Sequence, residues 1–262
     1  PVVEVTAPII EAQLAESAVV NALNLEITLA TKVSRCVQAA QGRQVVDFAL
    51  RRCQGSDAAL HLARAGYIAG LSATSNVYAA RELGIRPAGT MAHSYVTSFE
   101  SELAAFRAFA KLYRDRTVLL IDTYDTLSGA RKALQTAKEM AGREGVSLRG
   151  VRLDSGEMIS LSKKVRLLLD RGGFPDVKIF ASGGFDEYKI GEHVAGGARI
   201  DGFGVGTKMG VSADAPYTDM AYKLVQYDGR PVLKLSSGKR TLVSEKQVFR
   251  AIEEGQLKRD TI

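Results

Sequence analysis

Residues that can bind anions or move protons recur in this sequence just after its short apolar segments. Carboxylates, guanidinium groups, hydroxyls, an imidazole and glycine-rich loops hold phosphates or perform acid–base chemistry in many enzymes. The residues in these positions are Asp47, Phe48, Arg51, Arg52, Thr74, Ser75, Asn76, Thr90, His93, Asp122, Tyr124, Asp125, Arg152, Asp154, Ser155, Gly156, Ser182, Gly183, Gly184, Gly204, Gly206 and Thr207. Packing alone does not explain so many residues of these types in equivalent positions.

Two glycine loops near the end of this series predict a phosphate site. They are Ser-Gly-Gly at 182–184 and Gly-Val-Gly-Thr at 204–207. Glycine lets an anion approach the backbone N–H groups closely, and a helix N-terminus supplies further donors. Either loop alone is also typical of a simple tight turn, but two consecutive loops favour phosphate. Neither loop matches a P-loop or a GxGxxG fingerprint, so no ATP-binding P-loop or dinucleotide fold is expected.

Two acidic segments predict contacts to a metal or to sugar hydroxyls. Asp122 and Asp125 flank Tyr124, and carboxylates placed in this way can hold a phosphate-bound Mg²⁺. Capping of the next helix is the alternative role for Asp125. Asp154 is followed by Ser and Gly, which suits ribose hydroxyls, although Ser155 has helix capping as its own alternative.

His93 is the one histidine of three that follows a predicted strand, whereas His61 and His193 fall within predicted helices. A general base, a metal ligand and a nucleophile are all open roles for His93. No second His or Cys accompanies it, which disfavours the metal role. The two cysteines, Cys36 and Cys53, form no CxxC pair, which is typical of a reduced, intracellular protein without structural zinc.

The hydrophobic pattern predicts an α/β fold. An amphipathic stretch over 10–41 indicates one or two helices. Strands are then expected at 45–50, 70–74, 87–91, 117–124, 150–154, 177–182 and 200–206, with helices between them ending near 70, 84, 113, 144, 172 and 194. Continuous apolar strands with short crossovers indicate a parallel sheet buried on both faces. About seven βα units suit a closed parallel α/β barrel better than an open doubly wound sheet, which remains an alternative.

Both chain ends have a different texture from the barrel region. Residues 1–7 read as a strand, and an Asp-Gly pair between two alternating runs predicts a β-hairpin within 221–236. We therefore expect part of a flanking β-containing sandwich domain, built from both ends. The predicted divisions are a linking segment at 1–40, the barrel at 41–210 and a returning C-terminal segment at 211–262. We expect these residues to be a piece of a longer polypeptide.

Composition narrows the class of partner. The chain has 262 residues, 46% of them hydrophobic, and a formal charge of +6 from 35 basic and 29 acidic residues. This balance excludes a disordered chain, and no apolar run reaches the roughly 20 residues of a membrane span. The basic residues form no stripe, which argues against nucleic acid but stays compatible with phosphorylated small molecules.

With these motifs in hand, the chain resembles the nicotinate phosphoribosyltransferases, which are type II phosphoribosyltransferases. The similarity runs from about residue 5 to about residue 210 and rests on DFALRR, ATSN, GTMAHS, LIDTYDT, GVRLDSGE, the SGG loop and FGVGT, in that order. Such enzymes form nicotinate mononucleotide and pyrophosphate from nicotinate and phosphoribosyl pyrophosphate, in NAD biosynthesis. The resemblance implies an ATP-coupled, cytoplasmic homodimer that uses Mg²⁺.

The resemblance also implies roles for individual residues. His93 would be phosphorylated by ATP, and Asp122, Asp125 and Asp154 would handle Mg²⁺-pyrophosphate and ribose. The other implied contacts are to substrate. They are Thr90 and Arg152 with nicotinate, Phe48 stacked on its ring, Arg51 with donor phosphate or pyrophosphate, and Ser182, Gly183, Gly184, Gly204, Gly206 and Thr207 with the 5′-phosphate.

Ser75 bears on substrate choice. Related nicotinamide enzymes have an acidic residue here, and a neutral hydroxyl would not repel the carboxylate of nicotinate. An aromatic residue from an additional N-terminal segment would complete the pocket in the family. A transferase acting on nicotinamide or quinolinate remains an alternative, as do a non-catalytic phosphoribosyl- or nucleotide-binding barrel and a phosphate-binding barrel of unrelated chemistry.

Overall fold

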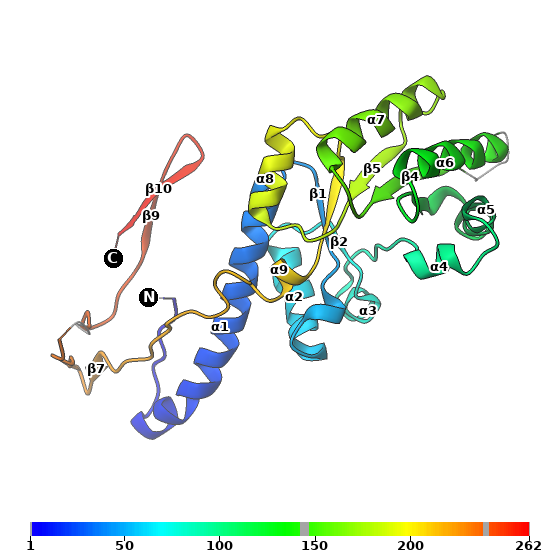
Figure 1. Cartoon of the computed structure of the whole chain (residues 1–262). Coiled ribbons are helices and arrows are strands. Elements are labelled where there is room, and N and C mark those ends of the chain that lie inside the picture. Colours follow the sequence, from blue (N-terminus) through cyan, green and yellow to red (C-terminus); the bar gives the residue numbers. More distant parts are fainter. Residues whose placement is uncertain (1, 142–146, 238–240, 262) are drawn as a thin grey trace. The chain divides into compact units, whose positions relative to one another are not determined.

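A computed structural model describes residues 2–141, 147–237 and 241–261 of the chain (Figure 1). The chain divides into two compact units. The larger spans 25–218, and the smaller combines 1–24 with 219–262. Each unit is considered by itself below. None of the described helices is long and apolar enough to cross a lipid bilayer.

The larger unit is built on a parallel sheet in the order β2-β1-β6-β5-β4-β3. Its strands are β1 (Gln44–Asp47), β2 (Ala73–Thr74), β3 (Thr117–Leu120), β4 (Leu148–Leu153), β5 (Lys178–Ala181) and β6 (Gly202–Val205). The last strand pairs with the first, with Val46 opposite Gly204. Read from β3, the order is 3-4-5-6-1-2, so strands adjacent in the chain are adjacent in the sheet except β2 and β3, which form its two edges. A doubly wound sheet reverses its order in the middle, so this arrangement is a curled, barrel-like sheet.

The prediction of a strand at 87–91 was wrong. In the described residues this segment is irregular, and only Pro87 makes an isolated parallel bridge, to Thr74. The Ala88 N–H donates to the Thr74 carbonyl at 2.9 Å, and the Thr74 N–H donates to the Arg86 carbonyl at 3.1 Å. Pairing does not extend because β2 ends at Thr74 and Asn76 already caps α3, so the partner strand does not continue beyond this bridge. The described sheet therefore has six strands where seven were predicted.

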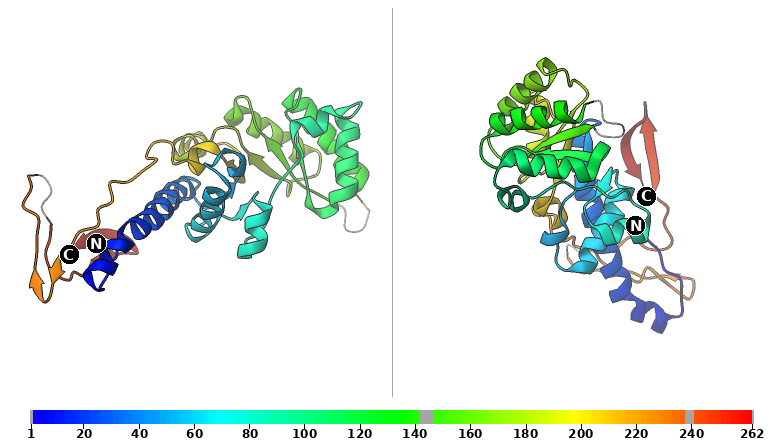
Figure 2. Two further views of the ribbon diagram at one scale, coloured as in Figure 1. Left: turned by 90° about the horizontal axis from the view of Figure 1, so that it is seen from below. Right: turned by 90° about the vertical axis from the view of Figure 1, so that its right-hand side faces the viewer.

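Helices follow the strands as the periodicity predicts. They are α1 (Ile9–Ala39), α2 (Ser56–Ile68), α3 (Val77–Leu83), α4 (His93–Thr97), α5 (Glu102–Tyr113), α6 (Thr126–Met140), α7 (Met158–Arg171), α8 (Glu187–Ala195) and α9 (Thr207–Gly210), with short 3₁₀ turns η1 (Leu50–Arg52) and η2 (Arg114–Arg116). The single helix expected up to residue 113 is two helices, because the Ser101 side chain caps the second by accepting from the Ala104 N–H. The 10–41 stretch forms one continuous helix (Figure 2).

Two apolar clusters pack helices against the sheet. Strands β1 and β6 contribute Val45, Phe203 and Val205 to a cluster with α1 and α8. Strands β3 and β4 contribute residues such as Leu119 and Val151 to a second cluster with α5, α6 and α7, which cover that part of the sheet (Figure 1). Removing these side chains from water supplies most of the stabilisation and leaves the strand ends free to carry polar groups.

Charged side chains join α1 to α8 and to the segment after α9. Lys32 is buried and lies 2.7 Å from Glu187 Oε2 and 2.5 Å from Asp214 Oδ1. Arg35 completes the cluster at 2.7 Å from Glu187 Oε1 and 3.0 Å from Asp214 Oδ2. Two cations therefore offset two anions, which lowers the cost of burying Lys32.

The smaller unit contains two hairpins. The predicted one is confirmed, with β7 (Gln226–Tyr227) and β8 (Arg230–Pro231) joined through Asp228 and Gly229. Both turn residues have positive φ (49° and 72°), as a type I′ turn requires. A second hairpin, not predicted, pairs β9 (Phe249–Glu253) with β10 (Gln256–Thr261).

The strand predicted at 1–7 is not found over the described residues 2–7. Glu4 instead accepts a hydrogen bond from the Lys246 N–H at 2.9 Å. The described part of this unit holds two separate two-stranded sheets. These residues do not by themselves complete the flanking sandwich expected from both ends.

Candidate functional site

The predicted site residues lie at one edge of the sheet. All six strands are parallel, so their carboxyl ends meet there, and the residues that follow β1, β2, β4, β5 and β6 come together. The contacts below show which of these side chains meet directly.

Arg152 is the centre of this arrangement. Its Nε donates to Ser182 Oγ at 2.7 Å, Nη1 to Thr90 Oγ1 at 2.8 Å, and Nη2 to Asp154 Oδ1 at 2.7 Å. The guanidinium carbon also lies 5.2 Å from the centre of the Phe48 ring. Three hydrogen bonds and an aromatic face fix the plane of this cation, and one N–H on each terminal nitrogen is left for a ligand.

Asp154 is held ionised by its neighbours. Burial raises the pKa of this carboxyl, but the hydrogen bond from Ser182 and the charge and hydrogen bond of Arg152 outweigh burial, so the pKa lies below its usual value. Ser182 accepts from Arg152 and donates to Asp154, so one buried hydroxyl joins the cation to the anion. The geometry thus places Ser182 within the protein network, whereas the sequence predicted it to contact phosphate.

His93 begins α4 beside this network. Its Nδ1 lies 3.1 Å from Thr123 Oγ1, and its Nε2 lies 3.7 Å from Asp154 Oδ2. The side chain is 44% exposed. The imidazole is therefore held at Nδ1, and its Nε2 faces the carboxylate of Asp154.

Asp122 supports the segment that follows β4. Its Oδ2 accepts from the Asp154 N–H at 2.8 Å and from the Ser155 hydroxyl at 2.7 Å. Its Oδ1 is buried and has no hydrogen-bond partner among the described residues. Because α7 begins at Met158 after Glu157, Ser155 is not a helix cap, and it contacts Asp122 instead.

Asp125 caps α6. Its Oδ1 accepts from the Ser128 N–H at 2.8 Å, which satisfies one of the free donors of the first turn. The alternative that the sequence left open for this residue is thus realised, and one of its carboxylate oxygens is occupied.

Phe48 follows β1, and Gly204 on the neighbouring strand β6 makes room for its ring. A Cβ at Gly204 would lie 2.6 Å from two atoms of the ring, which is closer than real carbon atoms approach. Gly204 was predicted to contact phosphate, but its geometry first explains how Phe48 reaches Arg152. The Phe48 ring is half-buried, so one part of it faces the site.

The two glycine loops differ in backbone conformation. Gly183 and Gly184 have φ of +103° and +68°, a region that favours glycine. A Cβ at Gly183 would lie 2.1 Å from the Asp154 carbonyl oxygen, so this loop packs tightly on the Asp154 segment. Gly206 precedes α9, and Thr207 is its exposed first residue.

Two lysines that were not predicted from the sequence as site residues lie beside these loops. Lys189 Nζ donates to the Gly183 carbonyl at 2.8 Å, and Lys208 Nζ to Asp186 Oδ2 at 2.6 Å. Burial raises the pKa of Asp186, but Lys208 and the Lys189 N–H lower it further, so the net pKa is below normal. A signal was present, because Lys208 directly follows the FGVGT motif.

The remaining predicted residues flank this edge. Arg51 is exposed on η1, directly after the Phe48 segment. Ser75 is half-buried after β2, and its N–H donates to the Asp47 carbonyl at 2.8 Å. Both belong to the same sheet edge, but no hydrogen bond or ion pair joins the side chain of either to the Arg152 network in the described parts of the chain.

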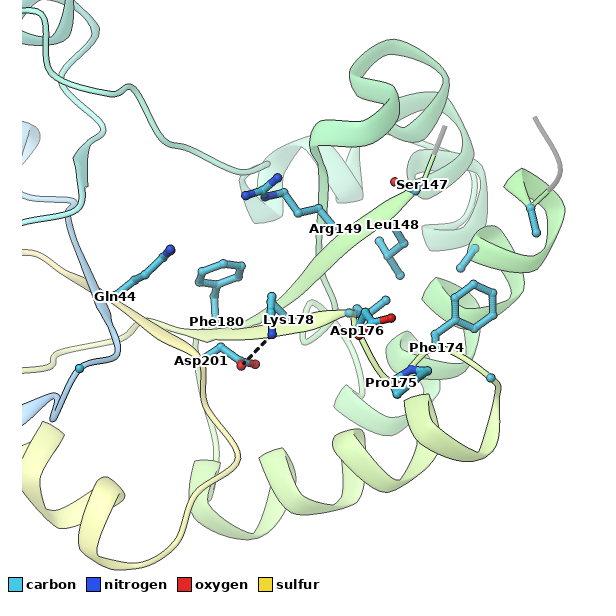
Figure 3. Close-up of a pocket in the computed structure, with 15 residues that line it drawn as sticks. Gln44, Ser147, Leu148, Arg149, Phe174, Pro175, Asp176, Lys178, Phe180 and Asp201 are labelled. Carbon is cyan, nitrogen blue, oxygen red and sulfur yellow. Dashed lines mark ion pairs between the residues drawn. The ribbon is translucent and has the colours of Figure 1, made fainter. Parts of the chain in front are cut away.

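A hollow of about 660 Å³ lies at the opposite edge, by the amino ends of the strands. Gln44, Arg149, Lys178, Phe180 and Asp201 line it, and Figure 3 shows Lys178 paired with Asp201 beside the Phe180 ring. It holds none of the predicted residues. Cavity size therefore does not identify the chemical site in this structure, whereas the convergence of polar side chains does.

The carboxylates at this edge of the sheet offer few ligands for a metal ion. Over residues 2–141, 147–237 and 241–261, no three His, Cys, Asp or Glu side chains are grouped as a metal site would require. The free Oδ1 of Asp122 is a suitable hard ligand for Mg²⁺. These residues therefore fit a cation that takes most of its ligands from substrate oxygens and water.

The sequence matches a family profile and a relative from the same enzyme family. The sequence profile of the nicotinate phosphoribosyltransferase (NAPRTase) family matches residues 43–251. A nicotinate phosphoribosyltransferase of Mycobacterium tuberculosis (strain ATCC 25618 / H37Rv) is 53% identical over 262 residues, which are 100% of this chain and 56% of that protein. The chain thus spans little more than half the length of this relative.

Two solved structures are similar in fold. The nicotinate-nucleotide pyrophosphorylase from Pyrococcus furiosus aligns with a TM-score of 0.77 and 31% identity, covering 93% of this chain and 60% of that one. Human nicotinic acid phosphoribosyltransferase aligns with a TM-score of 0.78 and 24% identity, covering 97% and 59%.

Proposed function

Because the chain belongs to the nicotinate phosphoribosyltransferase family, we propose that the protein forms nicotinate mononucleotide and pyrophosphate from nicotinate and phosphoribosyl pyrophosphate, as a step in NAD biosynthesis. The observation that carries the proposal is the fixed guanidinium of Arg152 between Thr90, Ser182 and Asp154, over the ring of Phe48. This arrangement suits a planar aromatic acid.

Nicotinate offers a ring and a carboxylate, and the site has a group for each. The ring stacks on Phe48, and the carboxylate accepts from the two terminal N–H groups that Arg152 leaves free. Ser75 adds no negative charge to this pocket. A carboxylate at position 75 would repel the carboxylate of nicotinate, whereas the neutral Ser75 does not. The pocket therefore accepts nicotinate in preference to nicotinamide.

The phosphoribosyl donor takes the other side of the site. Its 5′-phosphate lies on the N–H groups of Gly183, Gly184 and Gly206 and on the Thr207 hydroxyl, with Lys189 and Lys208 nearby as positive charge. Arg51 faces the pyrophosphate. These residues have the conformations and charges described above, which support the proposal.

Transfer breaks the bond from the anomeric carbon to pyrophosphate and forms one to the ring nitrogen of nicotinate. The ribosyl carbon becomes positively charged between the two, so the protein must position both partners and stabilise the leaving anion. Asp154 lies where it can stabilise the cationic ribose. Mg²⁺, held by pyrophosphate oxygens with Asp122 and the second oxygen of Asp125, would neutralise the leaving group.

ATP coupling through His93 is the further part of this proposal. With Nδ1 hydrogen bonded to Thr123, Nε2 attacks the γ-phosphorus of ATP, the bond to the β–γ bridging oxygen breaks, and ADP leaves. The phosphohistidine then raises affinity for the phosphoribosyl donor until it is hydrolysed. This makes the enzyme an ATP-coupled glycosyltransferase of ligase type.

The proposal extends to the assembly. We propose a cytoplasmic homodimer whose barrel has seven positions, with 87–91 in the seventh because Pro87 already bridges β2. In the same proposal, the two hairpins of the smaller unit contribute to a flanking sandwich. Size-exclusion chromatography with light scattering measures the oligomeric state.

Product formation tests the reaction. Purified protein is supplied with phosphoribosyl pyrophosphate, Mg²⁺ and either nicotinate, nicotinamide or quinolinate, with and without ATP. We expect nicotinate mononucleotide, formed faster with ATP. Absence of product from nicotinate would overturn the proposal, and product from quinolinate alone would favour the alternative of a transferase that acts on quinolinate.

Phosphate labelling tests the coupling step. With γ-labelled ATP, the wild type should acquire acid-labile, base-stable phosphate, and His93→Ala should not. The matched control is His61→Ala, because His61 lies on α2 and pairs with Glu26 at 2.8 Å, away from the Arg152 network. Binding of the donor without any labelling would instead favour a non-catalytic barrel.

A further inference from the structure

Asp47, the last residue of β1, is a fully buried carboxylate to which none of the roles above is assigned. Its exposed fraction is 0%, and it forms no ion pair within the described residues. Oδ1 accepts from the Ala49 N–H at 2.7 Å, and Oδ2 accepts from the Thr74 hydroxyl at 2.6 Å. Burying a carboxylate without a paired cation costs free energy, so the presence of Asp47 at this position needs a physical explanation.

These bonds join the ends of two neighbouring strands. Thr74 ends β2, and its hydroxyl also accepts from the Asn76 N–H at 3.0 Å. The Ser75 N–H donates to the Asp47 carbonyl at 2.8 Å. Asp47 thereby holds the backbone on both sides of Phe48 and, through Thr74, on both sides of Ser75.

The hydrogen-bond pattern requires an acceptor at both carboxylate oxygens. The Thr74 oxygen already accepts from Asn76, so its proton is directed at Asp47. An amide at position 47 has a single acceptor oxygen, so it cannot accept from both the Ala49 N–H and the Thr74 hydroxyl. Burial raises the pKa of Asp47, whereas the bonds from Thr74 and Ala49 lower it without restoring the normal value.

Asp47 cannot reach the site directly. Successive residues of a strand point to opposite faces, so Asp47 points away from the face that carries Phe48. We infer that Asp47, acting through Thr74 and Ala49, is a positioning residue that sets the separation of Phe48 and Ser75 and so determines selectivity for nicotinate over nicotinamide. The inference rests on the proposed function, because it concerns the pocket for that substrate.

Kinetics separate positioning from simple stability. Asp47→Asn and Thr74→Val should each raise KM for nicotinate about tenfold and lower the preference for nicotinate over nicotinamide by a similar factor, while kcat changes less than about twofold. Thr74→Ser keeps the hydroxyl and should restore wild-type values. Glu102→Gln is the matched control, because Glu102 is 2% exposed and pairs with Lys132 between α5 and α6.

Fluorescence gives a readout that needs no activity. The 262 residues contain no tryptophan, so Phe48→Trp places a single reporter at the site. Adding Thr74→Val should shift its emission to longer wavelength and raise acrylamide quenching about twofold, whereas adding Thr74→Ser or Glu102→Gln should leave both unchanged.

The outcomes are distinguishable. Wild-type KM and selectivity in Thr74→Val, or an unshifted emission, would overturn the inference even if melting temperatures fall. Should Asp47→Asn fail to fold, the comparison of Thr74→Val with Thr74→Ser decides. If the wild type makes no nicotinate mononucleotide, the proposed function fails, and the fluorescence pair still shows whether the Asp47–Thr74 bond positions residue 48.

Discussion

The Ser182 hydroxyl lies 2.7 Å from Arg152 Nε, and it donates in turn to the carboxylate of Asp154. One small side chain on the segment after β5 therefore fixes a cation and an anion that both come from the β4 segment. The residues of the Ser-Gly-Gly loop therefore have different roles. Ser182 is buried in the protein network, and Gly184 is the exposed part of the loop.

Replacing Ser182 by Ala should impair the pocket for nicotinate. The change leaves Arg152 Nε without its acceptor and Asp154 without one donor, and a hydrogen bond to a charged group contributes about 1.5–3 kcal/mol. We expect kcat/KM for nicotinate to fall about 10- to 100-fold, measured by steady-state kinetics. Ser162→Ala is the control, because Ser162 is also buried but bonds to the Ile159 carbonyl in α7 and to the Arg199 N–H before β6, away from the Arg152 network. Equal kinetics in both variants would contradict the prediction.

Adding a methyl group at Gly204 should displace Phe48. The new Cβ would lie 2.6 Å from the ring, and overpacking of this kind costs about 1–3 kcal/mol. Gly204→Ala should lower the melting temperature and raise KM for nicotinate. Gly191→Ala on α8 is the control, since a Cβ there meets nothing within 4 Å. If the clash is the cause, Phe48→Leu in the Gly204→Ala background recovers stability but not KM.

A negative charge at position 75 should weaken the preference for nicotinate over nicotinamide. Ser75→Asp brings a carboxylate to the pocket that is proposed to hold the carboxylate of nicotinate, and like charges in a partly buried site repel. The ratio of kcat/KM for nicotinate to that for nicotinamide should fall by about tenfold or more, measured by direct competition. Ser75→Asn introduces no charge, so it should shift the ratio far less. A ratio unmoved by the Asp variant would place the nicotinate carboxylate elsewhere.

The ion cluster around Lys32 should give stability that acid removes. A hydrogen bond from Lys32, partly offset by burial, lowers the pKa of Asp214 to about 2. A depressed carboxyl pKa means that the stabilisation is complete above the unfolded value near ~4 and is lost as pH falls from there toward the folded value.

Urea unfolding can check the sign of this effect. The difference in free energy of unfolding between wild type and Asp214→Asn should be constant from pH 7 to pH 5 and shrink between pH 4 and pH 3. The exposed Asp115 provides the control variant, Asp115→Asn. A difference that grew on acidification would contradict the assignment.

Much of the fold follows from local pattern. An apolar run such as 118–120 forms a strand because its side chains are buried on both faces of the sheet, and the amphipathic stretches between the strands form the helices that cover it. The turn at Asp228 and Gly229 was equally predictable, because positive φ at two successive residues demands such a pair. The one strand of the series that did not form is at 87–91, because its partner β2 ends at Thr74, where the chain turns into α3.

The site was predictable in place but not in detail. Parallel strands bring their carboxyl ends to one edge, so His93, Arg152 and the glycine loops had to lie near one another. The sequence itself therefore determined the α/β class, the edge that carries the polar residues and the family motifs.

Only the tertiary structure decided which groups meet. Arg152 finds Thr90 62 residues away and Ser182 30 residues away, while Asp125 turns to its own helix and Gly204 serves the ring of Phe48. Such pairings depend on how the strands align and how far each side chain reaches in space. Local hydrophobic periodicity predicts neither the alignment of the strands nor the reach of a side chain. It indicates which face a residue occupies, but not which residue lies opposite.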